Sequence, residues 1–406
     1  MTNAPHPGTR APAGSGAPVT GAWRPGDPVG RRRFAQVVEG RPFRLEGGGS
    51  LPGVRVAYET WGTLDEDRSN AVLVCHALTG DSHAAGRAGE GHPAPGWWDD
   101  MIGPGLGVDT DRWFVVCANV LGGCQGTTGP ADVDPRTGRP FGSQFPVVTI
   151  RDSVRTQAML ANGLGIKRWA AVVGGSMGGM QALEWAVMYP ERVGALVALA
   201  TTTAASPLQI AWSMVGRHAV QADPGFCGGD YYDRAPGEGP TRGLALARQI
   251  AQIHYRSEEA FSHKFGRSLL DPLDASGTFS LDQRFEVEGY LDYHGDKLVR
   301  RFDANSYLRL NKMMDLHDIG RGRGGVASAL GRVAAPALVM SIRSDALYPP
   351  SGQEALRDGL RAHGCRVGFY QIDSDDGHDG FLIEAAQISP LVAAFLDGAE
   401  PGLGMP

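Results

Sequence analysis

Residues 169–180 read WAAVVGGSMGGM, and they carry the most informative pattern in the chain. The apolar run at 169–173 indicates a buried strand, and the residues after the glycines, as far as 189, indicate a helix. Between them, Gly174-Gly-Ser176-Met-Gly178 matches G-x-S-x-G in its strand–turn–helix context. Small residues let strand and helix approach closely, while the turn exposes the Ser176 hydroxyl in a strained conformation. The pattern predicts a nucleophilic serine.

The alternative for such a turn is a glycine-rich phosphate loop. Neither a Gly-Lys-Ser/Thr ending nor G-x-G-x-x-G occurs here, so the nucleophile is favoured. The N–H of Met177 would begin the following helix, where it can stabilise negative charge that develops on a substrate.

A serine nucleophile needs a base and an orienting acid, which in this arrangement follow in the order Ser, Asp, His. Asp345 comes just after the apolar run ALVMSI at 337–342, and His378 comes after the probable last strand at 367–372. We therefore predict Ser176, Asp345 and His378 as the catalytic residues. Three rival acids look more like solvated loop charges: Asp373, Asp375 and Asp376.

The second backbone donor for an oxyanion should come from the loop after an early strand. The sequence HALTGD at 76–81 directly follows the apolar run AVLVC, and we nominate the N–H of Leu78. A plain turn at the end of the strand explains this segment equally well.

Short apolar runs alternate with helical stretches along most of the chain, which indicates a mostly parallel sheet covered on both faces. The expected strands are at 54–61, 71–75, 113–118, 169–173, 195–200, 337–342 and 367–372, and the expected helices at 151–163, 177–189, 351–362 and 380–396. With the serine turn, this predicts an α/β-hydrolase fold with acyl chemistry. Esterase, peptidase, lipase and acyltransferase activities all remain open at this point.

The segment 201–331 contains no convincing buried strand and is too long for one connection. We interpret it as a helical lid inserted into the sheet domain; a second independent domain is the alternative. The predicted organisation begins with a disordered N-terminal arm at 1–34 and ends with a short tail at 398–406. Between them, the two parts of the core at 35–200 and 332–397 flank the lid at 201–331.

Composition excludes several classes of protein. The chain of 406 residues has a net charge of −6, which argues against a generally basic nucleic-acid binder. Its longest apolar runs, such as 113–118, are far shorter than the roughly 20 residues of a membrane span. It contains 58 glycines and 27 prolines, and the arm at its start is rich in both. The five cysteines, with no C-x-x-C pair, suit reduced thiols in a cytoplasm.

Several longer motifs resemble the homoserine O-acetyltransferase family. They are HALTGDSH at 76–83, NVLGGCQGTTGP at 119–130, GGSMGG at 174–179, GDK at 295–297, RFDANSY at 301–307 and GHDGF at 377–381. The resemblance covers about residues 35–397. It implies acetyl transfer from acetyl-CoA to the side-chain hydroxyl of L-homoserine, in methionine biosynthesis, by a cytoplasmic homodimer with no bound cofactor or metal.

The resemblance also implies residues for the amino-acid substrate. By motif these are Arg248 and Tyr255 in the lid, and Asp379 beside the predicted histidine. Homoserine is a zwitterion, so a guanidinium suits its carboxylate and a carboxylate suits its ammonium. Without the resemblance, Arg248 would be assigned to a solvated helix face and Asp379 to a helix N-cap.

Some residues depart from the family pattern. Thr127 and Thr128 stand where many members have a serine, and the segment before Arg217 is unusual. Succinyl-CoA as donor and serine as acceptor therefore stay open. A hydrolase of the same fold and a non-enzymatic binding protein are the rival functions. Our hypothesis for the mechanism is a ping-pong transfer through acyl-Ser176, with the lid excluding water.

Overall fold

The computed structural model describes residues 16–271 and 279–398, and its centre is one eight-stranded sheet. The strand order is β1-β4-β8-β5-β11-β12-β13-β14, with antiparallel pairing of β1 with β4 and of β4 with β8, and parallel pairing in the rest. The strands are β1 (Arg33–Val38), β4 (Val54–Trp61), β5 (Ala71–Cys75), β8 (Phe114–Ala118), β11 (Ala171–Gly175), β12 (Leu196–Leu199), β13 (Ala337–Ile342) and β14 (Val367–Ile372).

Alternate residues of the central strands pack on opposite faces of the sheet, as a period of two requires. One apolar cluster joins Leu73 and Val339 to helices on one face of the sheet and to helices of the lid. The other joins Val72 and Leu338 to the C-terminal helices and to the segment at 84–108. The helices of the first face are α1 (Ile150–Gly163), α2 (Met177–Met188) and α9 (Pro350–Ala362), and that of the second is α11 (Ala385–Leu396). The predicted α/β-hydrolase fold, with a doubly covered sheet, is confirmed.

The remaining short elements connect these layers. Three two-stranded ribbons pair β2 (Phe43–Arg44) with β3 (Ser50–Leu51), β6 (Ile102–Gly103) with β7 (Val108–Asp109), and β9 (Val133–Asp134) with β10 (Arg139–Pro140). The short 3-10 helices are η1 (Gly142–Gln144), η2 (Pro190–Arg192), η3 (Pro224–Gly229) and η4 (Gly377–Asp379).

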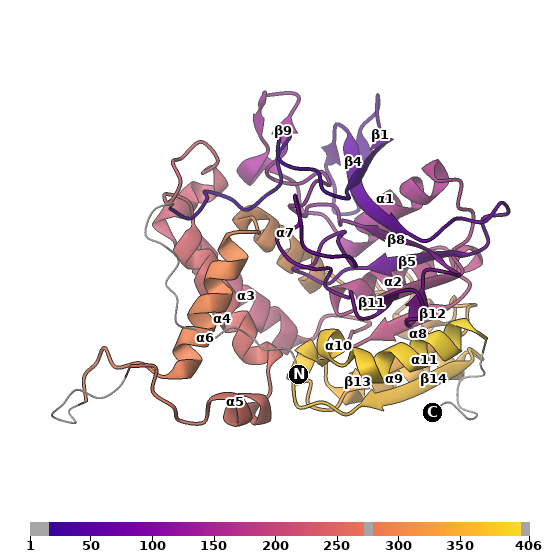
Figure 1. Ribbon diagram of the computed structural model, residues 1–406. Coiled ribbons are helices and arrows are strands. Elements are labelled where there is room, and N and C mark those ends of the chain that lie inside the picture. The colour runs from indigo at the N-terminus through magenta and orange to yellow at the C-terminus, as the bar shows by residue number, and fades with distance from the viewer. Residues whose placement is uncertain (1–15, 272–278, 399–406) are drawn as a thin grey trace.

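The helical lid lies between β12 and β13, which are neighbours in the sheet. Its helices are α3 (Pro207–Gln221), α4 (Thr241–Tyr255), α5 (Glu258–Phe265), α6 (Glu286–Val299), α7 (Ala304–Asp315) and α8 (Val326–Leu330). Helices α3, α4, α6 and α7 stand together at one side of the sheet (Figure 1). Among the described lid residues the only β-type pairings are two isolated bridges.

The predicted arm differs from the structure over residues 16–34. The N–H of Gly21 donates to Phe302 O at 3.0 Å, and the N–H of Trp23 donates to Cys124 O at 2.9 Å. The Thr20 hydroxyl donates to Asp303 at 2.8 Å. These contacts to distant residues order the segment, so the expectation of disorder is wrong there. Residues 1–15, and the predicted tail from 399 onward, lie outside the described residues.

Several elements also differ from the prediction. The strand predicted at 169–173 is Ala171–Gly175, so it includes the two glycines before Ser176. The edge strand β1 was not predicted, because its burial is irregular and its pairing with β4 is long-range. The helix predicted at 380–396 breaks at Glu384 into α10 (Gly380–Ile383) and α11.

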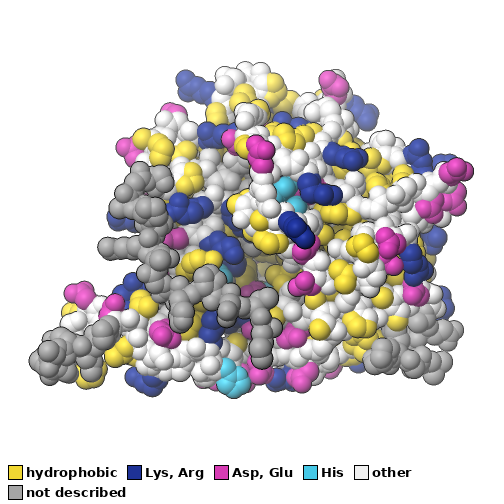
Figure 2. Space-filling model, in the orientation of Figure 1, with side chains coloured by type: hydrophobic (Ala, Val, Ile, Leu, Met, Phe, Trp, Pro, Cys, Tyr) yellow, Lys and Arg dark blue, Asp and Glu magenta, His cyan; other side chains and the backbone are white. Residues whose placement is uncertain are grey.

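The surface suits the modest net charge. Figure 2 shows basic and acidic side chains interspersed over one face, with hydrophobic side chains scattered among them. Within the described ranges, no single helix has the length and apolar character to cross a bilayer. Only the bent pair Gly377–Ile383 and Ala385–Leu396, at 62°, passes that test jointly, on length and composition alone.

Candidate active site

Ser176 stands in the sharp turn between β11 and α2, as the sequence predicts. Its φ and ψ are 57° and −127°, a strained conformation for a residue with a side chain. The turn requires glycine on both sides. A Cβ on Gly178 would lie 2.0 Å from Cys75 O, and one on Gly174 would lie 2.2 Å from Gly178 O. Backbone contact therefore holds the Ser176 hydroxyl at the carboxyl end of the sheet.

The three residues predicted as catalytic form one buried hydrogen-bonded chain. Nε2 of His378 is 2.9 Å from Oγ of Ser176, and Nδ1 of His378 is 2.7 Å from Oδ2 of Asp345. All three side chains are buried. A proton on Nδ1 leaves Nε2 free to accept the serine proton, which is the geometry that activates a hydroxyl.

Asp345 is fixed by its own loop. Its Oδ1 accepts the N–H groups of Leu347 and Tyr348, both at 2.9 Å, so Oδ2 is left for His378. The rival acids lie elsewhere: Asp373 and Asp375 pair with Arg343 at the surface, and Asp376 pairs with a lid arginine.

Aromatic rings surround the imidazole of His378. The ring centroids of Tyr348, Phe381 and Tyr255 lie 4.9, 5.2 and 5.6 Å from it. Burial raises the pKa of Tyr255 to about 12, against the opposing effect of Arg248. Both nearby tyrosines are therefore neutral near pH 7, since burial also raises the pKa of Tyr348.

The loop nominated for the oxyanion is firmly held beside the serine. Leu78 lines the same cavity as Ser176. The N–H of Gly80 donates to Ala77 O at 2.9 Å, and Arg301 of the lid donates to Thr79 O. The N–H of Met177 is the first N–H group of helix α2, so it has no hydrogen-bond acceptor within the helix. The donor roles of Leu78 and Met177 stay predictions.

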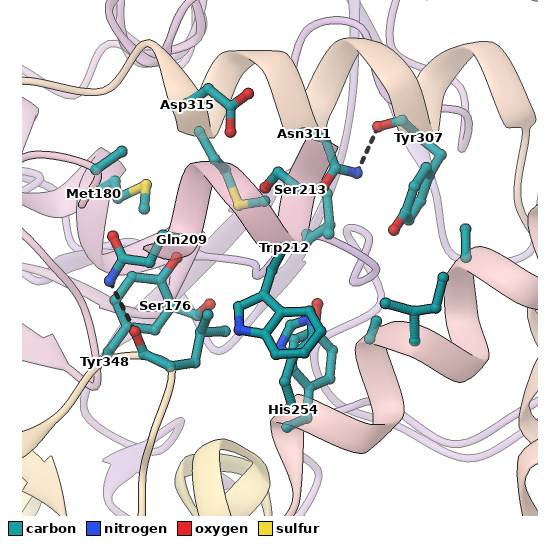
Figure 3. Close-up of a pocket in the computed structure, with 18 residues that line it drawn as sticks. Ser176, Met180, Gln209, Trp212, Ser213, His254, Tyr307, Asn311, Asp315 and Tyr348 are labelled. Carbon is teal, nitrogen blue, oxygen red and sulfur yellow. Dashed lines mark hydrogen bonds between the residues drawn. The ribbon is translucent and has the colours of Figure 1, made fainter. Parts of the chain in front are cut away.

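Lid helices close the cavity above Ser176. Its empty volume, including the space at its open side, is about 550 Å³, and side chains from α3, α4 and α7 line it (Figure 3). The lining residues that the sequence did not single out include Gln209, Trp212, Ser213, His254, Asn311 and Asp315. They are spread over 201–331, so only the packing of the lid brings them together.

Among these residues, His254 has a strongly shifted pKa. It stacks on Trp212 with ring centroids 4.8 Å apart. Burial lowers the pKa of His254 to about 3, with further lowering by His378 and Arg248. It is therefore neutral near pH 7 and can act in the cavity as a polar but uncharged side chain.

Of the three residues expected to bind the amino acid, Tyr255 lines this cavity, whereas Arg248 and Asp379 are not among its lining residues. The guanidinium of Arg248 is 5.5 Å from the ring centroid of Tyr255, which itself lines the cavity. Asp379 already has lid partners, with Oδ2 3.4 Å from Nε of Arg256 and 3.3 Å from Nε2 of Gln252. Arg256 and Gln252 belong to the site but carry no sequence signal of their own.

Among residues 16–271 and 279–398, one buried group has ligand atoms close enough for a metal ion: Glu59, His83 and His92. The two imidazoles stack at 3.8 Å and 11°, so one ion would lie out of the plane of both rings. Nδ1 of His83 is 2.9 Å from Glu59, and Nε2 of His92 accepts the N–H of Arg31 at 3.1 Å. This geometry favours a hydrogen-bonded cluster over a metal site.

Comparison with known proteins gives consistent results. A family model described as alpha/beta hydrolase fold matches residues 70–385. The homoserine O-acetyltransferase of Thermobifida fusca (strain YX) is 57% identical over 382 residues, covering 93% of this chain and 97% of the relative. The crystal structure of homoserine O-acetyltransferase from Bacillus anthracis superposes with a TM-score of 0.81 at 30% identity, over 90% of this chain and 98% of that one. Esterase E22 superposes with a TM-score of 0.80 at 29% identity, over 90% and 99%.

Proposed function

The chain belongs to the homoserine O-acetyltransferases of the α/β hydrolase fold, and we propose that it acetylates L-homoserine through an acetyl-Ser176 intermediate, as a step of methionine biosynthesis. The observation that carries the two-step mechanism is the buried chain from Ser176 through His378 to Asp345. A complete chain of this kind generates a nucleophile, which a mere binding protein does not need.

In the first half-reaction, His378 Nε2 accepts the proton of Ser176. Oγ attacks the thioester carbonyl of acetyl-CoA, and the negative charge on its oxygen is stabilised by the N–H groups of Leu78 and Met177. The C–S bond then breaks, and His378 returns the proton to the sulfur of CoA. Asp345 stabilises the imidazolium while it exists.

In the second half-reaction, the homoserine hydroxyl transfers its proton to His378 and attacks the acetyl carbon of the acetyl-serine. The bond from this carbon to Oγ of Ser176 then breaks, and His378 returns the proton to Oγ. We assign the substrate carboxylate to Arg248 and its ammonium to Asp379, with Tyr255 between them and the imidazole. Asp379 would then exchange part of its contact with Arg256 for the substrate ammonium. The lid over the cavity keeps water from the acyl-enzyme.

Rapid mixing with acetyl-CoA tests this mechanism. We expect a mass increase of one acetyl group on the peptide containing Ser176, and its loss when homoserine is added. Direct transfer without the adduct would overturn the two-step mechanism. Release of CoA from acetyl-CoA and succinyl-CoA, each with homoserine or serine, then identifies the donor and the acceptor.

Ester hydrolysis is a second candidate, because esterase E22 has the same architecture. A hydrolase shares the catalytic chain but does not need paired charges for a zwitterion. Its rate would be nearly unchanged by Arg248→Met, whereas acetylation of homoserine would be impaired. Release of CoA without any acceptor, as fast as with homoserine, would favour the hydrolase.

We also propose a homodimer that forms through the lid. The support is a set of exposed apolar side chains on the adjacent helices α3 and α4: Leu208, Ile210, Met214, Val215, Leu246 and Ile253. Sedimentation analysis should find a dimer, and Leu208→Asp with Val215→Asp should give a monomer. Val133→Asp, at an exposed residue of β9, is the matched control and should leave the dimer intact.

A cytoplasmic location is the last part of this proposal. All five cysteines are free thiols, and burial raises the pKa of Cys75, Cys117 and Cys124. Such thiols suit a reducing compartment. Cell fractionation with an antibody to the full chain tests the location.

A further inference from the structure

A second, larger groove lies beside the oxyanion loop, outside the cavity that holds Ser176. Its empty volume, including the open mouth, is about 1450 Å³. Its walls are the N-terminal segment at 18–32, the loop at 80–97 and the end of helix α6. None of its residues takes part in the chemistry derived above.

The groove has an excess of positive charge. It is lined by four cations, Arg32, Lys297, Arg300 and Arg301, and by two carboxylates, Asp27 and Asp81. Nη1 of Arg301 is 3.7 Å from Asp81. In the described part of the chain, no carboxylate lies within ion-pair distance of the other three cations.

Two further observations indicate that these charges lack anionic partners. Burial lowers the pKa of Lys297, and the nearby Arg301 and Arg248 lower it further, as expected for crowded like charges. Arg32 donates only to neutral oxygens, at Val29, Gly91 and Gln125, and its buried Nε has no partner among the described residues. An anionic ligand would relieve this repulsion.

The groove and the catalytic cavity share one loop. Leu78 lines the cavity, while Gly80 and Asp81 line the groove. Arg301 joins the end of α6 to this loop through Thr79 O. A ligand with one end in the groove can therefore reach past the loop toward Ser176. Trp97, held by a 2.9 Å hydrogen bond from Nε1 to Asp81 O, offers the groove an aromatic face.

We propose that this groove binds the phosphorylated nucleotide end of the acyl donor, with Lys297 and Arg300 at its phosphates and Trp97 beside its base. This inference rests on the proposed use of acetyl-CoA. The chemistry required is a polyanion joined to a purine, which matches the excess cations and the indole. The proposal takes these contacts to be equally strong in the ground state and the transition state, and contacts of that kind lower KM without raising kcat.

Two acetyl donors separate this site from the chemistry at Ser176: acetyl-CoA, and S-acetyl-pantetheine, which lacks the nucleotide. We expect Lys297→Met and Arg300→Met each to raise the KM for acetyl-CoA by at least about tenfold, since each removes a charge-assisted contact. The KM for S-acetyl-pantetheine, the KM for homoserine and kcat should stay unchanged. Lys297→Arg should retain most of the affinity for acetyl-CoA. Lys167→Met, at an exposed lysine outside the groove, is the control and should change neither donor.

An equal effect on both donors, or no effect on acetyl-CoA, would overturn the proposal. Calorimetric titration with adenosine 3′,5′-bisphosphate tests the groove without any acetyl transfer. The wild-type chain should bind this probe, and the double variant of Lys297 and Arg300 should bind it at least about tenfold more weakly. If the probe binds in this way but acetyl transfer fails, the proposed function is wrong and the nucleotide site stands. If the probe does not bind, the nucleotide site is wrong.

Discussion

The sheet domain and the lid contribute to the same cavity in different ways. Ser176, Asp345 and His378 follow the carboxyl ends of β11, β13 and β14, whose register is fixed by parallel pairing through β12. The lid contributes side chains from within helices, such as Trp212 and Asn311. Strand ends fix the positions of the three hydrogen-bonded residues, whereas packing of the lid helices sets the shape of the cavity. From this difference we predict that the chemistry depends on the sheet domain and that part of the substrate recognition depends on the lid.

The two regions meet at the loop that carries His378. The lid residue Arg256 pairs with Asp376 and Asp379, and the Ser257 hydroxyl donates to Asp375 O. Gly377 lies so close to the lid that a Cβ there would be 2.4 Å from Tyr255 O. These contacts orient the histidine loop from the lid side. Variants that compare the sheet domain with the lid should therefore be made at residues outside these contacts.

The largest expected effect is on the chemistry of the sheet domain. Ser176→Ala should lower kcat by on the order of 10⁴–10⁶, because it removes the atom that carries the acetyl group. The release of CoA measures this loss, and calorimetric binding of homoserine should be nearly unchanged. A comparable loss of homoserine binding would contradict the separation of chemistry from recognition.

The next effect is on the packing that holds the serine turn. Gly178→Ala should destabilise the chain by about 3 kcal/mol or more, because its Cβ would overlap a backbone oxygen of β5. Urea denaturation followed by circular dichroism measures the change in the free energy of unfolding. Gly352→Ala in α9 is the matched control, since a Cβ there meets nothing within 4 Å and should leave stability within about 1 kcal/mol.

A smaller effect is expected from the lid side of the cavity. Arg248→Met should raise the KM for homoserine roughly 10–100-fold, through loss of a charge-assisted contact to its carboxylate. The rate of acetylation of Ser176 in single-turnover experiments should stay the same. Arg242→Met, an exposed arginine in the first turn of the same helix, should change neither value. A slower acetylation step in Arg248→Met would mean that the lid takes part in the chemistry.

The smallest effect is a difference in acid stability. Burial lowers the pKa of His294 on α6 to about 3, and Arg248, Lys297, Arg256 and Lys264 lower it further. The unfolded chain takes up this proton near pH 6.5 and the folded chain does not, so stability is present above pH 6.5 and is lost as the pH falls toward 3. The melting temperature should therefore decrease over this range.

The matched variants for acid stability are His294→Gln and His218→Gln, the latter at an exposed histidine of α3. Between pH 6.5 and pH 4.5, the melting temperature of His294→Gln should fall by less than that of the wild-type chain. We expect the two decreases to differ by roughly 2 °C or more. His218→Gln should follow the wild type. Identical pH profiles for all three proteins would show that His294 does not contribute to the acid sensitivity.

Sequence reasoning succeeded where the signal is local. The strands at 71–75 and 337–342 have the boundaries predicted from apolar runs, since a strand buried on both faces is apolar throughout. The strand at 54–61, predicted from its alternation, and the strand at 367–372 also have the predicted boundaries. The serine turn was recognisable because G-x-S-x-G is contiguous in the sequence, although the contact that requires Gly178 is with Cys75 of β5. Asp345 and His378 could be chosen because each directly follows such a strand.

Prediction failed where a contact is long-range. The order in residues 16–34 depends on Phe302, Asp303 and Cys124, which no periodicity near the N-terminus reveals. The cavity residues of the lid are ordinary members of amphipathic helices, and no spacing distinguishes them from solvated or packed positions. Arg256 could not be assigned, because its partners follow it by more than a hundred residues.

The amino-acid sequence by itself determined the sheet, the serine turn and the order of the three residues of the hydrogen-bonded chain. These depend on local apolar patterns and on a glycine motif whose residues are contiguous in the sequence. The tertiary structure alone decided which lid side chains face Ser176, that the histidine loop is held from the lid, and that cations gather beside the oxyanion loop. Those features depend on how separate elements pack together, and packing is fixed by the whole chain rather than by any segment of it.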